Sequence, residues 1–216
     1  LFRSRSLLAC AESDLVFMQH AEDLTLSKHG AMTESDVSRK LGVQGQDPNA
    51  EGVMVERDVA LARETGARYH VLHTSTARSL KAIAAAKEAG LPVSCEASPH
   101  HLLLTLHAAE EKAAGFAKAP FGVVGLETAF PALMTLVHDG TLGAMHAVRL
   151  MTTGPAHVLR DSRIGRLLGT DRLSGVAVVD PDARWEVTPE SLAGRSRNSA
   201  FLGRTFRGRI TNTFTV

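Results

Sequence analysis

The sequence has few cysteines, no long apolar run and almost no net charge. Its two cysteines, Cys10 and Cys95, lie far apart and form no CxxC pair, so we expect a reduced, cytoplasmic protein. No apolar stretch approaches the roughly 18–20 residues of a membrane span. Lys and Arg number 24 against 23 Asp and Glu, which gives no electrostatic footprint for nucleic acid or an anionic membrane. Both kinds of partner are therefore unexpected.

What is present fits an ordinary globular chain. The 216 residues, 44% of them apolar, suffice for one large domain or a domain with a small appendage. The first residues, "LFRSRSLLACAES", are basic and apolar, but their apolar core "LLACA" is too short for a signal peptide. We expect them to be the end of a helix that continues from residues before them.

The first hundred residues alternate between strand and helix patterns. Short apolar segments predict strands, and segments with helical spacing that end in Gly66 and Gly90 predict helices. In chain order these are strand 14–19, a polar loop 27–49, helix 50–66, strand 69–73, helix 75–90 and strand 92–97. Short connections between such elements predict a parallel sheet with crossover helices, hence an α/β fold.

The second half has a different texture. The spacing predicts a helix over 125–140, and two helices over 142–159 that are broken at Gly154 and Pro155. Residues 174–187 and 201–216 read as short β segments. Only about three βα units are visible, whereas a complete (β/α)8 barrel needs about 250 residues. We expect an incomplete (β/α)8 (TIM) barrel over 1–164 and a small C-terminal β appendage over 165–216.

Two histidines occupy equivalent places in this pattern. His20 follows the first strand in "VFMQHAED", and His73 ends the second in "YHVLHTST". Functional groups in parallel α/β folds gather at the carboxyl ends of strands, and imidazole is a common zinc ligand. The alternative is that both are hydrogen-bonded structural residues. His70 should face the core or a helix.

The adjacent pair His100 and His101 follows the third strand. Neighbouring side chains near a strand end point in different directions, so we interpret this pair as loop packing or as support for a site rather than as two metal ligands.

Several blocks of the sequence resemble bacterial type I dihydroorotases, which belong to the cyclic amidohydrolases. They are "HAED" (20–23), "YHVLHTST" (69–76), "SCEASPHHLLLT" (94–105), "APFGVVGLET" (119–128) and "SRNSAFLGRTFRGRI" (196–210). The resemblance covers nearly the whole chain. The blocks around the two histidines and "APFGVVGLET" together favour dihydroorotase over its relatives.

The resemblance implies a metal-dependent (β/α)8 barrel with a small β domain and a zinc centre. It implies the zinc-dependent, reversible hydrolysis of dihydroorotate to N-carbamoyl-aspartate in pyrimidine biosynthesis. By this resemblance His20 and His73 are metal ligands, and His107, Phe121 and Gly122 bind substrate.

Parts of the family pattern have no counterpart in this sequence. It contains no HxH pair, and the bridging carboxylate of the family precedes residue 1. Leu106 stands directly before His107, where relatives carry "DHAP" with the catalytic aspartate, so we assign no catalytic residue. We expect an N-terminally truncated and internally deleted relative with an incomplete zinc site, which is inactive alone.

Three other interpretations stay open. The chain could be a related cyclic amidohydrolase, such as an allantoinase or hydantoinase. It could be a non-catalytic dihydroorotase-like partner of aspartate transcarbamoylase. It could also be a decayed fragment without a function of its own.

Overall fold

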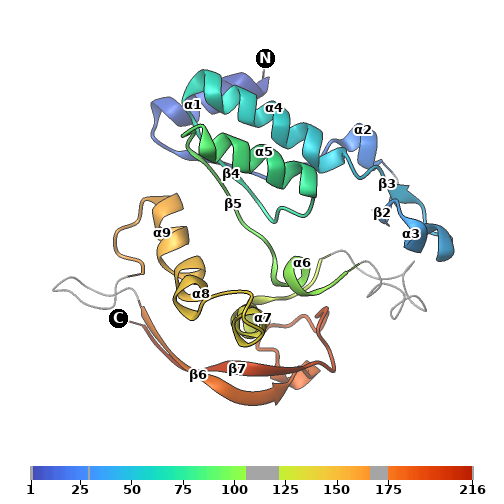
Figure 1. The fold of residues 1–216 in the computed structure, drawn as a ribbon, viewed down its shortest axis with the longest axis vertical. Helices are drawn as coiled ribbons and strands as arrows, with labels where there is room; N and C mark the ends of the chain where they lie inside the picture. Colours follow the sequence, from blue (N-terminus) through green and yellow to red (C-terminus); the bar gives the residue numbers. More distant parts are fainter. Residues whose placement is uncertain (1, 29, 106–121, 166–174, 216) are drawn as a thin grey trace. The chain divides into compact units, whose positions relative to one another are not determined.

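The computed structural model describes residues 2–28, 30–105, 122–165 and 175–215 (Figure 1). The chain separates into two compact units, residues 1–120 and 121–216, and each is described by itself. None of the helices within the described ranges is long and apolar enough to cross a membrane.

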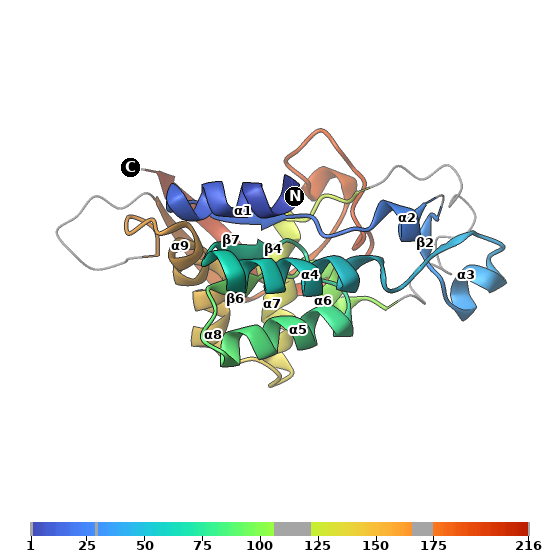
Figure 2. The same ribbon diagram turned by 90° about the horizontal axis from the view of Figure 1, so that it is seen from above.

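The first unit is built on a parallel three-stranded sheet. Its strands are β1 (Val16–Gln19), β4 (Arg68–Val71) and β5 (Val93–Cys95), in the order β1-β4-β5. Helices α4 (Ala50–Thr65) and α5 (Ala77–Glu88) lie side by side (Figure 2) and connect the strands. The β-α-β-α-β order predicted from the sequence is therefore confirmed.

The core lies between this sheet and its helices. Tyr69 and Val71, both fully buried, pack in one cluster with Val55, Ile83 and other residues of α4 and α5. Side chains alternate along a strand, so His70 projects from the opposite face of the sheet. It is buried there, as predicted.

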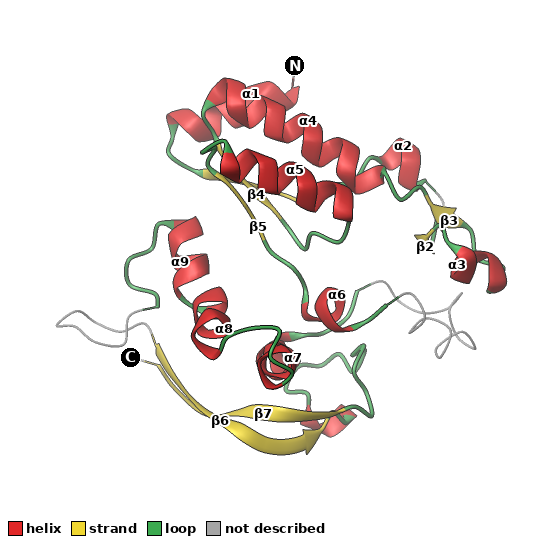
Figure 3. Ribbon diagram, in the orientation of Figure 1, coloured by secondary structure: helices red, strands yellow, loops and turns green. Residues whose placement is uncertain are grey.

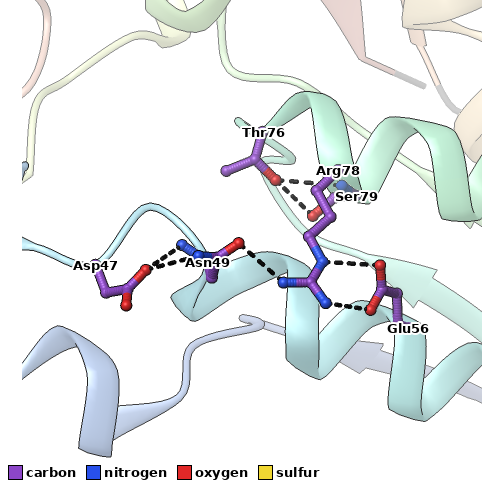
Figure 4. Close-up of polar contacts among 6 residues, drawn as sticks. All are labelled: Asp47, Asn49, Glu56, Thr76, Arg78 and Ser79. Atoms are coloured by element: carbon purple, nitrogen blue, oxygen red, sulfur yellow. Dashed lines mark hydrogen bonds and ion pairs between the residues drawn. The ribbon is translucent and has the colours of Figure 1, made fainter.

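The helix ends follow the signals in the sequence. Gly66 ends α4 with a left-handed φ of 72°, a conformation that glycine adopts without a steric penalty. Thr76 precedes α5, and its side chain accepts a hydrogen bond from the backbone N–H of Ser79 (Figure 4). Helix α1 (Phe2–Glu12) precedes β1 and packs on α4, as expected for residues that read as a helix end.

The segment 27–49 is more ordered than the polar loop predicted for it. It contains β2 (Met32–Thr33), α3 (Asp36–Lys40) and β3 (Gly45–Gln46), after the short α2 (Leu24–Ser27). Ser35 and Ser38 form a reciprocal capping box at the start of α3. Such elements are too short for a hydrophobic period, which is why the sequence pattern did not reveal them.

Within its described residues, the second unit combines three α-helices with a two-stranded antiparallel ribbon (Figure 3). Helix α7 packs against β7. A 3-10 turn, η2, precedes β7. The elements are α7 (Leu126–His138), α8 (Ala144–Met151), α9 (Thr153–Leu159), β6 (Gly175–Glu186), η2 (Pro189–Ser191) and β7 (Thr205–Thr215). Both predicted β segments are thus strands.

The break between α8 and α9 falls at Thr152, not at Gly154 and Pro155 as predicted. Pro155 lies in the first turn of α9, where the missing N–H would have no intrahelical partner in any case. A short helix, α6 (Pro99–Leu103), also occupies the segment that carries His100 and His101.

Candidate functional site

His20 and His73 come together at the carboxyl edge of the sheet. Each follows one of two neighbouring parallel strands, β1 and β4, and the backbone N–H of Leu72 donates to Gln19 O across the strand ends. His20 Nδ1 lies 3.1 Å from His73 Nε2, and the rings meet edge to face at 4.8 Å between centroids. The two side chains are therefore the centre of a candidate site.

A carboxylate fixes which nitrogen of His20 faces its partner. Glu22 Oε2 lies 3.1 Å from His20 Nε2. A carboxylate only accepts, so this contact places a proton on Nε2, and in the neutral ring the lone pair is then on Nδ1, the nitrogen next to His73. Hydrogen bonds from Ser27 and then from His20 hold the pKa of Glu22 below its ordinary value. Carboxylates orient metal-binding histidines in this way.

The pair has the spacing of two ligands of one metal ion. Two nitrogens bound to tetrahedral zinc at about 2.0–2.1 Å lie about 3.3 Å apart, close to the 3.1 Å seen between these rings. Zinc sites take three or four protein ligands. Among the described residues, however, there is no group of three His, Cys, Asp or Glu that could hold a metal ion. The described residues therefore offer two candidate ligand nitrogens here, not a full ligand set.

The turn that carries His73 is held by groups from three elements. His73 itself has a left-handed φ of 34°, which is uncommon for a residue with a side chain. Glu96, directly after β5, accepts from Thr74 N through its carbonyl at 2.8 Å. Glu51, at the start of α4, binds Ser75 and Thr76. No local pattern in the sequence singles out either acid.

The other histidines near this edge make contacts of their own. His70 is hydrogen-bonded to Ser94 Oγ at 2.8 Å and lies 3.5 Å from Glu96 Oε2. His100 and His101 stack edge to face on α6, and burial is the main cause that lowers the pKa of both imidazoles. They therefore stay neutral to a lower pH than an exposed histidine does.

Of the predicted substrate residues, only Gly122 lies within the described part of the chain. His107 and Phe121 fall in 106–121, outside it. Gly122 has a left-handed φ of 83°, and its carbonyl accepts from Asn198 Nδ2 at 2.5 Å. Val124 N donates in turn to Asn198 O at 2.9 Å. Gly122 and Val124 are thus held by Asn198, which lies 76 positions beyond Gly122, and no local pattern indicates this contact.

Solved structures with a similar fold are cyclic amidohydrolases. The D-hydantoinase from Thermus sp. matches with a TM-score of 0.81 at 19% identity, over 99% of this chain and 58% of its own. The L-hydantoinase from Arthrobacter aurescens gives 0.81 at 21%, over 98% and 57%. The chain therefore shares the fold of these hydantoinases.

The relatives found by sequence comparison are dihydroorotases. Residues 2–79 match the family described as Dihydro-orotase-like. The dihydroorotase of Anaplasma phagocytophilum (strain HZ) is 32% identical over 99% of this chain and 57% of its own length. That of Anaeromyxobacter dehalogenans (strain 2CP-1) is 36% identical over 90% and 55%. Over nearly its whole length the chain is thus similar to dihydroorotases.

The chain spans somewhat more than half the length of these curated relatives. The alignment with the Anaplasma protein runs over 257 residues, more than the 216 of this chain. The match therefore passes over positions of the relative to which no residue here corresponds.

Proposed function

We propose that this chain carries part of a dihydroorotase active site, with His20 and His73 as two zinc ligands. The observation that supports the proposal best is the convergence of His20 Nδ1 and His73 Nε2 at 3.1 Å, with Glu22 behind His20. The reaction would be the reversible hydrolysis of dihydroorotate to N-carbamoyl-aspartate in cytoplasmic pyrimidine biosynthesis. Two unpaired cysteines suit a reducing compartment.

We further propose that this chain alone does not turn over substrate. Two neutral imidazoles bring no negative charge to a zinc ion, and the described residues hold no third ligand beside them. Such a pair binds the metal weakly. Hydrolysis also needs a group that accepts a proton from water, and no aspartate or glutamate of the described chain is assigned to that task.

The substrate segment is proposed to include His107, Phe121 and Gly122. The support for Gly122 is local. The hydrogen bond from Asn198 holds the left-handed backbone of Gly122. Because glycine has no side chain, the peptide group stays uncovered. A backbone fixed in this way can present peptide groups to a small polar ligand.

The three parallel strands with their crossover helices are proposed to be part of a (β/α)8 barrel. The boundary after residue 164, with a β appendage over 165–216, belongs to the same proposal. This proposed boundary separates the barrel from the appendage. It differs from the division into compact units, which falls after residue 120.

The metal role is tested by zinc binding in competition with a chromogenic chelator. The wild-type chain should bind zinc weakly, and His20→Ala and His73→Ala should each remove that binding. His157→Ala, at a histidine on α9 of the second unit, is the control and should bind like the wild type. Equal zinc affinity in all four proteins would refute the metal role.

Activity is tested with purified chain, added zinc, and dihydroorotate, hydantoin and allantoin as separate substrates. We expect no hydrolysis of any of them by folded protein. Zinc-dependent hydrolysis of dihydroorotate that His73→Ala abolishes would show that the chain is a complete enzyme. Turnover of hydantoin or allantoin instead would reassign the substrate.

A second candidate function follows from the same incomplete ligand set: a non-catalytic partner of aspartate transcarbamoylase. Co-purification of the two proteins at a fixed ratio, unaffected by His73→Ala, would favour it. Elution of the chain free of the transcarbamoylase would remove it.

A further inference from the structure

The turn from Leu72 to Thr76, here called the His73 turn, has every backbone N–H engaged by another element. Leu72 donates to Gln19 O after β1, and Thr74 donates to Glu96 O after β5. His73 N points to Glu96 Oε1, but at 3.4 Å this contact is long for a hydrogen bond. The two remaining N–H groups, at Ser75 and Thr76, both depend on one carboxylate.

That carboxylate belongs to Glu51 in the first turn of α4. Ser75 donates its N–H to Oε2 at 3.0 Å and its hydroxyl to the same oxygen at 2.6 Å. Thr76 donates its N–H to Oε1 at 3.1 Å and its hydroxyl to that oxygen at 2.9 Å. Each oxygen of the carboxylate therefore accepts one backbone and one side-chain donor from two consecutive residues.

The contacts with Glu51 are charge-assisted. Hydrogen bonds to an ionised carboxylate are about twice as strong as bonds between neutral groups. Burial acts to raise the pKa of Glu51, but the hydrogen bonds from Ser75, Ser79 and Thr76 outweigh it and lower the pKa below its ordinary value. The side chain is thus a partly buried, charged anchor.

The anchor lies next to the one residue of the turn whose backbone is strained. A residue with a side chain in the left-handed region persists only where its surroundings hold it. Without Glu51, the turn could relax at His73, and a change in the φ of His73 swings its ring. The position of the His73 ring opposite His20 therefore depends on the hydrogen bonds that Ser75 and Thr76 donate to Glu51.

We propose that Glu51 is a positioning residue for His73: by binding Ser75 and Thr76 it holds the His73 turn so that the His73 ring faces His20. This inference rests on the proposed function for the importance of His73, but its geometric content can be tested without metal. Glu51 acts through the turn and touches no substrate.

The test compares Glu51→Ala with Glu51→Gln by solution NMR, with far-UV circular dichroism as a check of the fold. In Glu51→Ala the amides of Ser75 and Thr76 should exchange at least about fivefold faster, the ratio that one lost hydrogen bond gives. The imidazole nitrogen resonances of His20 and His73 should shift. Gln keeps one acceptor oxygen, so Glu51→Gln should restore part of both effects.

Glu56→Gln is the matched control. Glu56 lies on the same helix and also joins α4 to α5, through Arg78 at 2.6 and 2.8 Å (Figure 4), but away from the turn. Its substitution should leave the His20 and His73 resonances and the exchange of Ser75 and Thr76 as in the wild type. If Glu51 only linked α4 to α5, as Glu56 does, Glu51→Gln and Glu56→Gln would change the histidine resonances and the amide exchange to the same extent.

Zinc affinity adds a second readout. If the wild type binds zinc through the pair, Glu51→Ala should weaken the affinity about tenfold or more, as loss of an orienting group does. If the wild type binds no zinc, the metal role fails while the NMR comparison still decides the positioning role. Unchanged histidine resonances and amide exchange in folded Glu51→Ala, or in Glu51→Gln should the alanine variant not fold, would overturn the proposal.

Discussion

Among single residues, Tyr69 is the largest side chain that is fully buried, and it carries a polar group into the core. Its hydroxyl donates to Gln19 Oε1 at 2.8 Å. Within the described chain the Nε2 of Gln19 has no partner. Burial is the main cause that raises the pKa of Tyr69, so the hydroxyl stays protonated and can keep donating.

Tyr69→Phe should lower the free energy of unfolding by about 1–3 kcal/mol, because it leaves a buried acceptor unpaired. Urea unfolding at neutral pH measures this loss. The double variant Tyr69→Phe with Gln19→Met removes both polar groups and should recover part of it. A double variant less stable than Tyr69→Phe alone would show that the pair does not account for the cost.

Glu51 predicts a dependence on pH. Its pKa in the folded chain lies below the ordinary value of 4.5, so the folded state binds fewer protons than the unfolded state near that pH. The stability from Glu51 is therefore present above pH 4.5 and lost as pH falls through the lower folded pKa. The difference in unfolding free energy between wild type and Glu51→Gln should shrink between neutral pH and about pH 3.5. A constant difference would contradict this.

The site could be predicted from the sequence only as far as strand ends can be predicted. The sequence predicts that His20 and His73 lie at one edge of the sheet, because each follows an apolar strand segment. In the structure their rings meet there. Glu51 and Asn198 could not be found in this way, because their partners lie 24 to 25 and 76 residues away. Such contacts depend on how helices and loops pack, which no local pattern encodes.

Among the elements, long periodic segments were predictable and short ones were not. Helices α4 and α5 were found from their apolar spacing and terminal glycines, and β1, β4 and β5 from their apolar runs. The two-residue strands β2 and β3 have no period to detect. The break at Thr152 was misplaced because Gly and Pro usually end helices, whereas here Pro155 stands where a helix tolerates it.

The packing of α7 on β7 depends on the absence of a side chain at Gly208. Its φ is 109°, and a Cβ added there would lie 2.8 Å from Met134 Cγ. Gly208→Ala should lower the free energy of unfolding by about 1–3 kcal/mol through backbone strain and overpacking. Gly194→Ala is the control, since an added Cβ would meet no atom within 4 Å. Equal thermal unfolding of both variants would contradict this close approach.

For the molecule as a whole, the core and the histidine pair are separate. The buried cluster of the first unit is apolar and includes neither His20 nor His73. Removal of metal with EDTA should therefore leave the far-UV circular dichroism and the Tm unchanged, unlike a domain that folds around zinc. A loss of structure on chelation, reversed by zinc, would mean that the metal contributes to folding.

The left-handed backbone of His73 is strained for a residue with a side chain, which lowers the stability of the fold. A glycine would occupy a φ of 34° without steric cost, so His73→Gly should unfold at a higher temperature than His73→Ala, although both lose the imidazole. The difference in unfolding temperature between these two variants measures the cost of placing a side chain on this left-handed backbone. If His73 serves the site proposed above, that difference is the stability that the fold loses for its site.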